Sequence, residues 1–170
     1  MEYRQLTKED AVQYRELRLI ALQTDADAFS TSFYEANERP LSATIENLEN
    51  PYAISFGAFS GESLISTMTL IQLQGKKTQH RAELVAVYTA EKARGTGAAS
   101  GLFDYLLAYI RSEGMLEQLE LAVNAANQRA IRFYERCGFQ RIGTTPNAQK
   151  TEGRSIDELL MLMPLQTEKQ

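Results

Sequence analysis

The stretch EKARGTGAASG, residues 91–101, follows an apolar, strand-like run, ELVAVYTA (83–90), and precedes a leucine-rich run. A strand, a glycine-rich turn and a helix N-terminus form an anion site, because unpaired N–H groups of the first helical turn converge where the helix dipole is positive. Small side chains let a phosphate group approach the backbone, and a Cβ at Gly95 or Gly97 would limit that approach or a positive φ angle. We therefore predict that this turn binds an extended phosphate group.

Two common classes of phosphate-binding protein fit this turn poorly. A P-loop requires G-x-x-x-x-G-K-[ST], and no lysine stands at the required position. A dinucleotide fold requires G-x-G-x-x-G after the first strand of a parallel unit, whereas here Ser100 replaces the third glycine and the strand comes late in the chain. The P-loop is excluded, and the dinucleotide fold is kept as a weaker alternative that predicts affinity for NAD(P).

Outward from the turn, hydrophobic periodicity predicts an α+β fold. Three runs before the turn alternate in hydrophobicity and are joined by short turns, which is typical of an antiparallel meander. After the turn, apolar residues recur at spacings of three and four, which predicts a helix that ends at Gly114. We expect one domain over residues 1–170 with helices on a mixed sheet. The expected strands are 2–6, 52–59, 63–73, 83–90, 116–123, 138–145 and 155–165, and the expected helices are one opened by a capping box at 7–10, then 27–38, 42–50, 98–113 and 127–136.

Composition argues against several classes of partner. A net charge of −4, without a basic stripe interleaved with aromatic residues, argues against nucleic acid. There is no run of 18 apolar residues, and the N-terminus MEYRQLTKED lacks the apolar stretch of a signal peptide. We therefore expect no membrane contact and a cytoplasmic protein. A single cysteine, Cys137, and a single histidine, His80, are too few for a structural zinc site, and we expect no metal.

Two segments carry a more specific pattern. Arg94–Ala99 matches R/Q-x-x-G-x-G/A, and Asn127–Phe139 matches N-x-x-A-x-x-x-Y-x-x-x-G-F. In this order and spacing they resemble the coenzyme A loop and the following helix of the GNAT superfamily of N-acetyltransferases. The resemblance implies an acyltransferase whose mixed, mostly antiparallel sheet opens in a V-shaped splay between the strand before the loop and the strand after it.

The resemblance also implies that acetyl-CoA is the cofactor. Backbone N–H groups of the glycine turn would bind its pyrophosphate, and the exposed edge of the preceding strand would pair with its pantetheine arm. Asn127 would reach that arm, or would serve only as a helix N-cap. The cofactor-binding residues implied in this way are Val87, Thr89, Arg94, Gly95, Thr96, Gly97, Ala98, Ala99, Ser100, Asn127 and Tyr134.

By the same resemblance Tyr134 is the general acid that protonates the departing thiolate of coenzyme A. A phenol with an ordinary pKa of about 10 stays protonated at neutral pH, and the alternative is an amphipathic tyrosine on a helix face. Glu83, where many members carry a base, is the candidate to deprotonate the amine, and the alternative is a glutamate facing solvent. Alternation places Glu83, Val85 and Val87 on one face, unless a bulge, common in this strand across the family, intervenes.

Glu120 is a reserve candidate for the base. Ala122 stands where members that acetylate protein N-termini often carry glutamate, and Glu120 lies two residues before it on the same face of the strand. Ala122 therefore argues against an N-terminal acetylase. We interpret His80 and Cys137 as structural, because direct transfer in this family requires no acyl-enzyme.

The segment 24–51 corresponds to the acceptor side in this family. Its acidic residues would attract a cationic amine, or they are solvated faces of surface helices. We expect the acceptor to be a primary amine of a small molecule or peptide; a non-catalytic acyl-CoA-binding sensor is the alternative. The apolar strand 155–165 suggests pairing across a homodimer. The acidic residues of the segment, set against Arg39 alone, are Asp25, Asp27, Glu35, Glu38, Glu46 and Glu49.

Overall fold

The computed structural model describes residues 1–166; residues 167–170, the end of the predicted domain, lie outside the described part. None of the helices described is long and apolar enough to cross a membrane. The helices and strands are β1 (Glu2–Gln5), α1 (Ala11–Thr24), α2 (Phe33–Glu38), α3 (Leu41–Glu49), β2 (Ala53–Ser60), β3 (Ser63–Gln72), β4 (Arg81–Thr89), α4 (Ala98–Glu113), β5 (Gln118–Asn124), α5 (Gln128–Cys137), β6 (Gln140–Thr151) and β7 (Arg154–Pro164).

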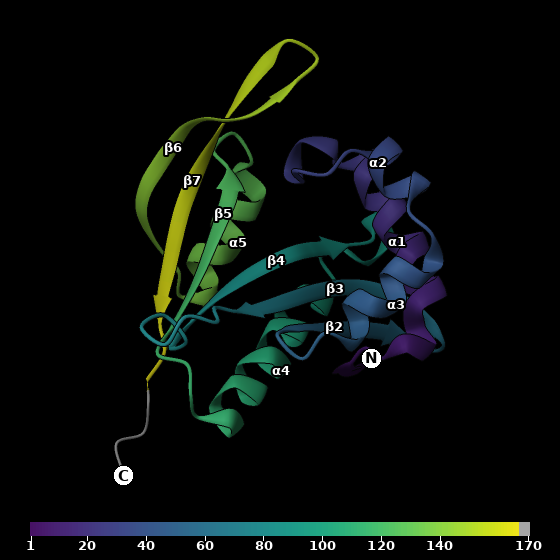
Figure 1. Cartoon of the computed structure of the whole chain (residues 1–170), viewed down its shortest axis with the longest axis horizontal. Coiled ribbons are helices and arrows are strands. Elements are labelled where there is room, and N and C mark those ends of the chain that lie inside the picture. The colour runs from purple at the N-terminus through teal and green to yellow at the C-terminus, as the bar shows by residue number, and fades with distance from the viewer. Residues whose placement is uncertain (167–170) are drawn as a thin grey trace.

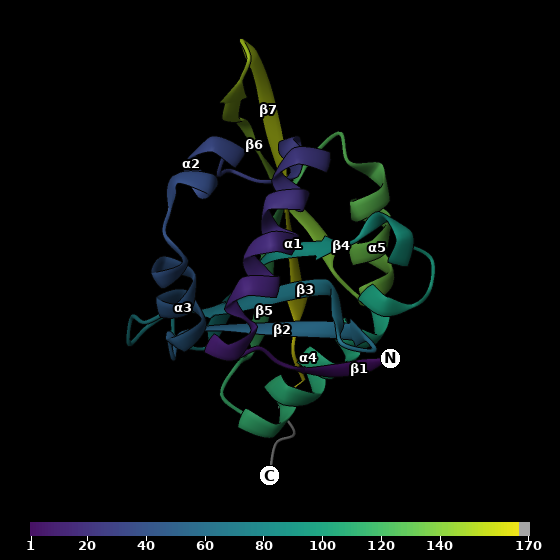
Figure 2. The same ribbon diagram turned by 90° about the vertical axis from the view of Figure 1, so that its right-hand side faces the viewer.

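The strands form one 7-stranded sheet in the order β1-β2-β3-β4-β5-β7-β6 (Figure 1). Neighbouring strands are antiparallel, except that β4 and β5 run parallel. Helices lie on both faces of this sheet (Figure 2). The predicted α+β fold, with a mixed and mostly antiparallel sheet flanked by helices, is confirmed.

The two faces of the sheet carry separate clusters of buried side chains. On one face, Leu102 and Leu106 of α4 pack in a cluster with Met68 of β3. On the other, Leu17 of α1 packs in a cluster with Tyr88 of β4. Burial of such side chains is the main favourable contribution to folding. As a result β4 is covered from both sides and presents different residues to each.

A buried carboxylate joins β1 to the start of α1. Thr7 and Asp10 form the predicted capping box, in which the Thr7 N–H donates to Asp10 Oδ2 at 2.8 Å. The Arg4 guanidinium adds two hydrogen bonds to the same carboxylate, at 2.8 and 2.7 Å. Hydrogen bonding from Arg4 lowers the pKa of Asp10, despite the opposing effect of its burial.

The C-terminal hairpin differs from expectation in length and in pairing. β6 continues to Thr151 and turns tightly at Glu152 and Gly153, so most of residues 146–154, which separate the expected strands 138–145 and 155–165, are strand as well. The hairpin projects beyond the rest of the sheet (Figure 1). β7 lies between β5 and β6, so both of its edges are paired along most of its length. Residues 155–165 therefore lack the free edge expected for pairing with a second copy, because the edge strand is β6, and the homodimer itself stays a prediction.

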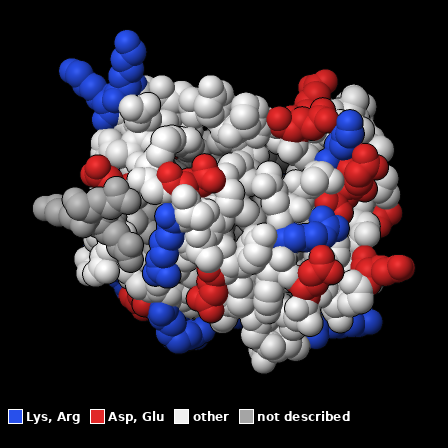
Figure 3. Space-filling view, turned by 90° about the horizontal axis from the view of Figure 1, so that it is seen from below, with Lys and Arg blue, Asp and Glu red and all other residues white. Residues whose placement is uncertain are grey.

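The surface carries charges of both signs. In the view from below, Lys and Arg side chains lie among Asp and Glu side chains (Figure 3). Some of the surface charges form ion pairs, such as Arg141 with Glu135 at 2.7 Å and Lys8 with Glu49 at 3.6 Å. Exposed pairs of this kind contribute little to stability.

Candidate functional site

The site is centred on a gap between β4 and β5. These strands pair only at Arg81–Glu83 and Gln118–Glu120, and then diverge (Figure 1). From Leu84 onward, the edge of β4 that faces β5 therefore has no strand partner. A cavity of about 500 Å³ occupies the gap and is lined by both strands, the glycine turn and α5. The expected V-shaped splay is present.

A bulge in β4 lies at the mouth of this gap. Thr69 of β3 pairs with Val85, but Thr67 pairs with Tyr88, so β4 carries one more residue than its partner. Ala86 takes up the irregularity with a φ of 51°. Because strand side chains alternate between faces, the extra residue changes which face each following side chain occupies.

The bulge corrects the alternation expected for β4. Glu83 and Val85 face the α1 side of the sheet, whereas Val87 packs on the α4 side, against the cluster that contains Leu102. Val87 therefore faces the cavity that holds the glycine turn, and Glu83 does not. The single face expected for these three residues is interrupted by a bulge of the kind the family resemblance implied.

The glycine turn leaves several N–H groups without partners. The first N–H of α4 to bond within the chain is that of Gly101, which donates to the Gly97 carbonyl at 2.9 Å. For the N–H groups of residues 97–100, the described part of the chain provides no hydrogen-bond acceptor. Such a group of donors at the positive end of a 16-residue helix is suited to an anion.

The geometry of the glycines leaves room for that anion. Gly95 and Gly97 have φ angles of +78° and +87°, a region that other residues rarely adopt. A Cβ built on either glycine meets no protein atom within 4 Å, so the space beside the turn is open. The turn therefore fits an extended phosphate group.

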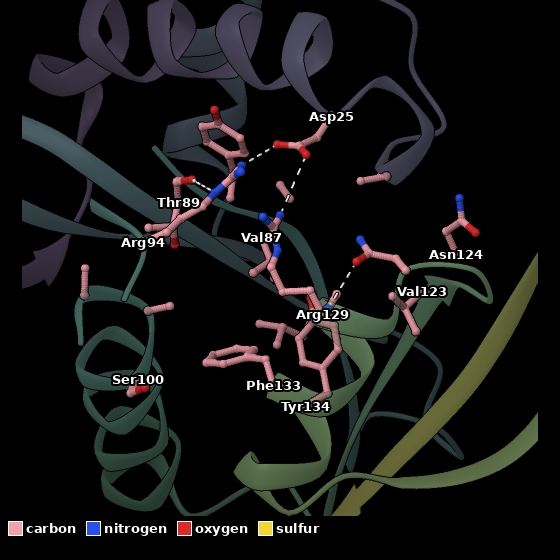
Figure 4. Close-up of a pocket in the computed structure, with 18 of the residues that line it drawn as sticks. Asp25, Val87, Thr89, Arg94, Ser100, Val123, Asn124, Arg129, Phe133 and Tyr134 are labelled. Atoms are coloured by element: carbon pink, nitrogen blue, oxygen red, sulfur yellow. Dashed lines mark hydrogen bonds and ion pairs between the residues drawn. The ribbon is translucent and has the colours of Figure 1, made fainter. Parts of the chain in front are cut away.

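Arg94 ties the glycine turn to β4 and to the end of α1 through hydrogen bonds within the protein. Its Nε donates to the Thr89 carbonyl at 3.1 Å, and its Nη2 bonds to Asp25 (Figure 4). Asp25 also lies 3.7 Å from the Arg129 guanidinium. The Thr96 hydroxyl donates to the Ala93 carbonyl at 2.6 Å, and Thr96 is the one predicted cofactor residue that does not line the cavity.

Tyr134 projects from α5 into the same cavity as Val87 (Figure 4). Its ring lies edge-on to those of Phe133 and Phe139. Burial raises the pKa of Tyr134 well above its ordinary value. In the described part of the chain no group forms a hydrogen bond with its hydroxyl. The phenol is therefore protonated, and its O–H is free to donate to a ligand in the cavity. Asn127 also lines the cavity, and its side chain accepts from the Ala130 N–H at 3.1 Å, which confirms the N-cap.

A second cavity, of about 640 Å³, opens on the α1 side of the gap. Leu84, Val85 and Ala86 line both cavities, so the two meet at the bulge. Glu83 and Glu120 line only the second cavity.

The two candidate bases differ in their partners. The Glu120 carboxylate accepts two hydrogen bonds from Arg81, at 2.9 and 2.8 Å, and one from Gln118 at 2.7 Å. Hydrogen bonding from Arg81 is the main reason that the pKa of Glu120 is lowered. A carboxylate held in this way is a weak base. Glu83, which pairs with Glu120 across the two strands, is exposed, so water can reach its carboxylate, and it is the better candidate for the base.

The acidic segment does not form the expected rim. Asp27 pairs with Arg154 at 3.2 Å, and Glu35 caps α2 by accepting from the Ser32 N–H at 2.8 Å. Among the acidic residues of segment 24–51, only Asp25 lines any of the cavities described, and it lies on the side of the glycine turn.

Sequence reasoning missed two residues on the α1 side of the gap. Phe29 lines both cavities, and the Arg18 guanidinium carbon lies 4.8 Å from the centre of its ring. Arg18 stands four residues from Tyr14 and from Leu22, within the partly buried stripe of α1. The spacing of Arg18 from Tyr14 and Leu22 could have marked it as an inward-facing arginine, but not what it contacts.

Known proteins share both the sequence pattern and the fold. The model of the acetyltransferase (GNAT) family matches residues 16–139. An uncharacterized N-acetyltransferase of Mycobacterium tuberculosis is 44% identical over 62 residues, which are 36% of this chain and 39% of that protein. The chain thus matches well under half the length of this relative.

Solved structures extend the likeness of fold to the whole chain. A probable acetyltransferase from Staphylococcus epidermidis superposes with a TM-score of 0.82 at 23% identity, over 97% of this chain and 99% of that one. A ribosomal-protein-alanine N-acetyltransferase from Brucella melitensis superposes with a TM-score of 0.83 at 21% identity, over 97% and 100% of the two chains. The family match covers most of the chain and agrees with this fold. The chain therefore belongs to the GNAT family of acetyltransferases, which confirms the predicted family and, at that level, the predicted acyltransferase.

Proposed function

We propose that this protein is an N-acetyltransferase that moves the acetyl group of acetyl-CoA to a primary amine by direct attack in a ternary complex. One observation carries the proposal. The gap between β4 and β5 opens to both faces of the sheet, with an anion cradle on one side and a second cavity on the other. Two substrates approaching from opposite faces would meet at Val85 and Ala86.

The cofactor side of the site fits coenzyme A. The N–H groups of residues 97–100 would bind the pyrophosphate, and the unpaired edge of β4 at Val87 would pair with the pantetheine arm. Acetyl-CoA supplies a thioester that an amine attacks. Thr89 contributes less than expected, because its carbonyl is bonded to Arg94 and its hydroxyl lies 2.8 Å from that of Ser66.

We assign a separate catalytic role to each group near Val85 and Ala86. A backbone N–H at the bulge would stabilise the negative charge that develops on the acetyl oxygen. Tyr134 would hold a proton for the departing thiolate, since burial keeps the phenol protonated. Glu83 would take the proton of the amine through water, because a rise of about 3.3 Å per residue puts its Cα roughly 10 Å from that of Ala86.

Tyr134→Phe tests the proposal. We expect kcat to fall about 100-fold or more, with the affinity for acetyl-CoA nearly unchanged, because the variant removes only the proton donor. Calorimetric titration gives the affinity, and release of free thiol with a panel of primary amines gives kcat. Tyr109→Phe, a partly buried tyrosine on α4, is the matched control.

The outcomes separate the alternatives. Equal rates for Tyr134→Phe and the natural protein would remove Tyr134 from the mechanism. Binding of acetyl-CoA without turnover of any amine would favour a sensor. Binding of NAD(P) in place of acetyl-CoA would favour a dinucleotide protein. A folded protein that binds none of these would contradict the phosphate site itself.

A further inference from the structure

A third cavity, of about 530 Å³, lies between the α1 face of the sheet and helices α1, α2 and α3. Its charged lining consists of Arg15, Arg18 and Arg39, and none of its described lining residues is Asp or Glu. We call it the arginine cavity. It is the opposite of the acidic rim expected from the composition of segment 24–51.

Arg18 is the most telling residue of the arginine cavity. Within residues 1–166, its Nη1 is the single fully buried side-chain nitrogen or oxygen without a hydrogen-bond partner. Burial lowers the pKa of Arg18; Tyr14 opposes this shift, and the charge of Arg39 adds to it. A buried donor that lacks an acceptor is costly, and the cost is greater when the group is charged. Such a group requires an acceptor, which a bound ligand can supply.

The neighbouring side chains do not neutralise this charge. Arg15 donates from Nη2 to the carbonyl oxygens of Asn37 and Arg39, at 3.0 and 3.1 Å, which ties the exposed end of α2 to α1. The acidic residues nearest to these arginines along the chain, Glu16 and Glu38, are exposed and do not line the cavity. The arginine cavity therefore keeps a net positive charge.

The arginine cavity leads to the reaction centre. Val85 and Ala86 line it as well as the two cavities of the gap. Arg18 lines both the arginine cavity and the acceptor-side cavity. A small molecule held at Arg18 by one end would extend its other end toward the bulge.

We propose that the arginine cavity binds an oxyanion of the acceptor, so that the substrate is a small molecule carrying both a primary amine and a carboxylate or phosphate group. Arg18 would pair with the oxyanion and so position the amine at Val85 and Ala86. Guanidinium groups match both oxyanions in geometry, and the volume suits a small ligand. This proposal rests on the proposed function, because it names the acceptor of the same site.

The experiment measures binding and turnover separately. The protein, saturated with coenzyme A, is titrated by ligand-observed NMR with L-amino acids and with their amides, and with O-phosphoethanolamine and ethanolamine. Each pair differs in its oxyanion and keeps its amine. Turnover of the same compounds is followed with acetyl-CoA. The variant is Arg18→Met, which keeps the packed stem, and the control is Arg111→Met, an exposed arginine of α4.

We expect one class of oxyanion compound to bind at least 10-fold more tightly than its neutral partner, and Arg18→Met to abolish the difference. Arg111→Met is expected to retain it, and coenzyme A affinity is expected to be equal in all proteins. The amino-acid and phosphoethanolamine arms identify the oxyanion.

Equal binding of charged and neutral partners, or no binding of any, would overturn the arginine cavity as an oxyanion site. Acetylation of neutral amines alone would overturn it while leaving the transferase intact. Oxyanion binding that depends on Arg18 without turnover would keep the site and contradict the proposed function. Arg18→Lys, which keeps the charge, separates a lost charge from a disturbed fold.

Discussion

At the scale of the residue, the effect of burying a polar side chain depends on whether it has hydrogen-bond partners. Asp10 is 6% exposed and fully satisfied, by Arg4 and by the Thr7 N–H. Tyr134 is 8% exposed and has its hydroxyl facing a cavity rather than a fixed acceptor. The first arrangement stabilises the fold, and the second leaves a donor for chemistry.

The satisfied carboxylate leads to a prediction on stability. We expect Asp10→Asn to lower the free energy of unfolding at pH 7 by about 1–2 kcal/mol, the lower range for bonds to a charged group, because Arg4 is partly exposed. The melting temperature is expected to fall by about 2–8 °C. Calorimetric melting measures it, and Asp104→Asn, an exposed residue of α4, is the control.

The same variant has a defined pH dependence. The folded-state pKa of Asp10 is lowered, so its contribution is present above the unfolded pKa of about 3.9 and is lost as the pH falls through the folded value. The melting temperatures of Asp10→Asn and the natural protein are therefore expected to converge below about pH 4. A constant difference down to acid pH would show that the charge of Asp10 is not what stabilises the fold.

Individual residues of the site were only partly predictable. Tyr134 and Gly97 stand in motifs that resemble those of a family, and each lines the cavity around the gap. Ala86 adopts a positive φ although it is not glycine, so no residue type marks the bulge in advance. Arg18 and Phe29 depend on how segments distant in sequence pack together, which periodicity does not report.

At the scale of the element, α4 begins and ends at glycines in the left-handed conformation. Gly97 has a φ of +87° and Gly114 a φ of +68°, and a Cβ on either meets no atom within 4 Å. Alanine at either position is strained by roughly 1 kcal/mol. The two ends are therefore matched in conformation and differ in what lies beside them.

This symmetry gives a controlled test of the anion cradle. We expect Gly97→Ala to raise the dissociation constant of acetyl-CoA about 10-fold or more, because its methyl group would enter the space of the phosphate. Gly114→Ala is expected to destabilise the protein by a similar amount and to leave that constant unchanged. Calorimetric titration and thermal melting measure the two effects. Equal affinities in both variants would mean that the turn at Gly97 does not contact the cofactor.

The same element shows why parts of the fold were predictable. Glycines stop α4 at both ends, so residues 98–113 were correctly delimited from the sequence. The second half of β6, residues 146–151 (PNAQKT), was missed because it begins with a proline and is otherwise mostly polar, so it lacks the hydrophobic alternation that marks a half-buried strand. The pairing of β6 with β7 is interrupted between Thr145 and Gln149, an irregularity that the sequence does not indicate.

At the scale of the whole molecule, the sheet consists of two parts joined by few pairs. β1 to β4 form one part, β5 to β7 the other, and the direct pairing between them is limited to residues 81–83 and 118–120. A ligand that lies in the gap would contact both parts. Binding is therefore expected to stabilise the junction more than the periphery of the sheet.

Hydrogen exchange tests this expectation. At an acetyl-CoA concentration about 100 times the dissociation constant, we expect amides of residues 84–89 that exchange through opening of the gap to slow by up to about 100-fold. The β2–β3 hairpin turn at residues 60–63 lies away from the gap and is expected to change little. Mass spectrometry of peptides with and without acetyl-CoA provides the measurement. Equal protection of both segments would contradict binding in the gap.

The bulge at Ala86 also bears on how such a protein diversifies. Because one extra residue shifts the alternation of β4, the proposed function would have Glu83 and Val85 face the acceptor and Val87 face the cofactor. Substitutions before and after the bulge would then act on different substrates, although both lie in one strand. On that proposal, mutations before the bulge would alter the choice of acceptor while the contacts to the cofactor after the bulge stay in place. A deletion of this one alanine would place Val87 directly after Val85 and restore regular alternation, so each side chain would keep its face while the irregularity where the cavities meet would be lost.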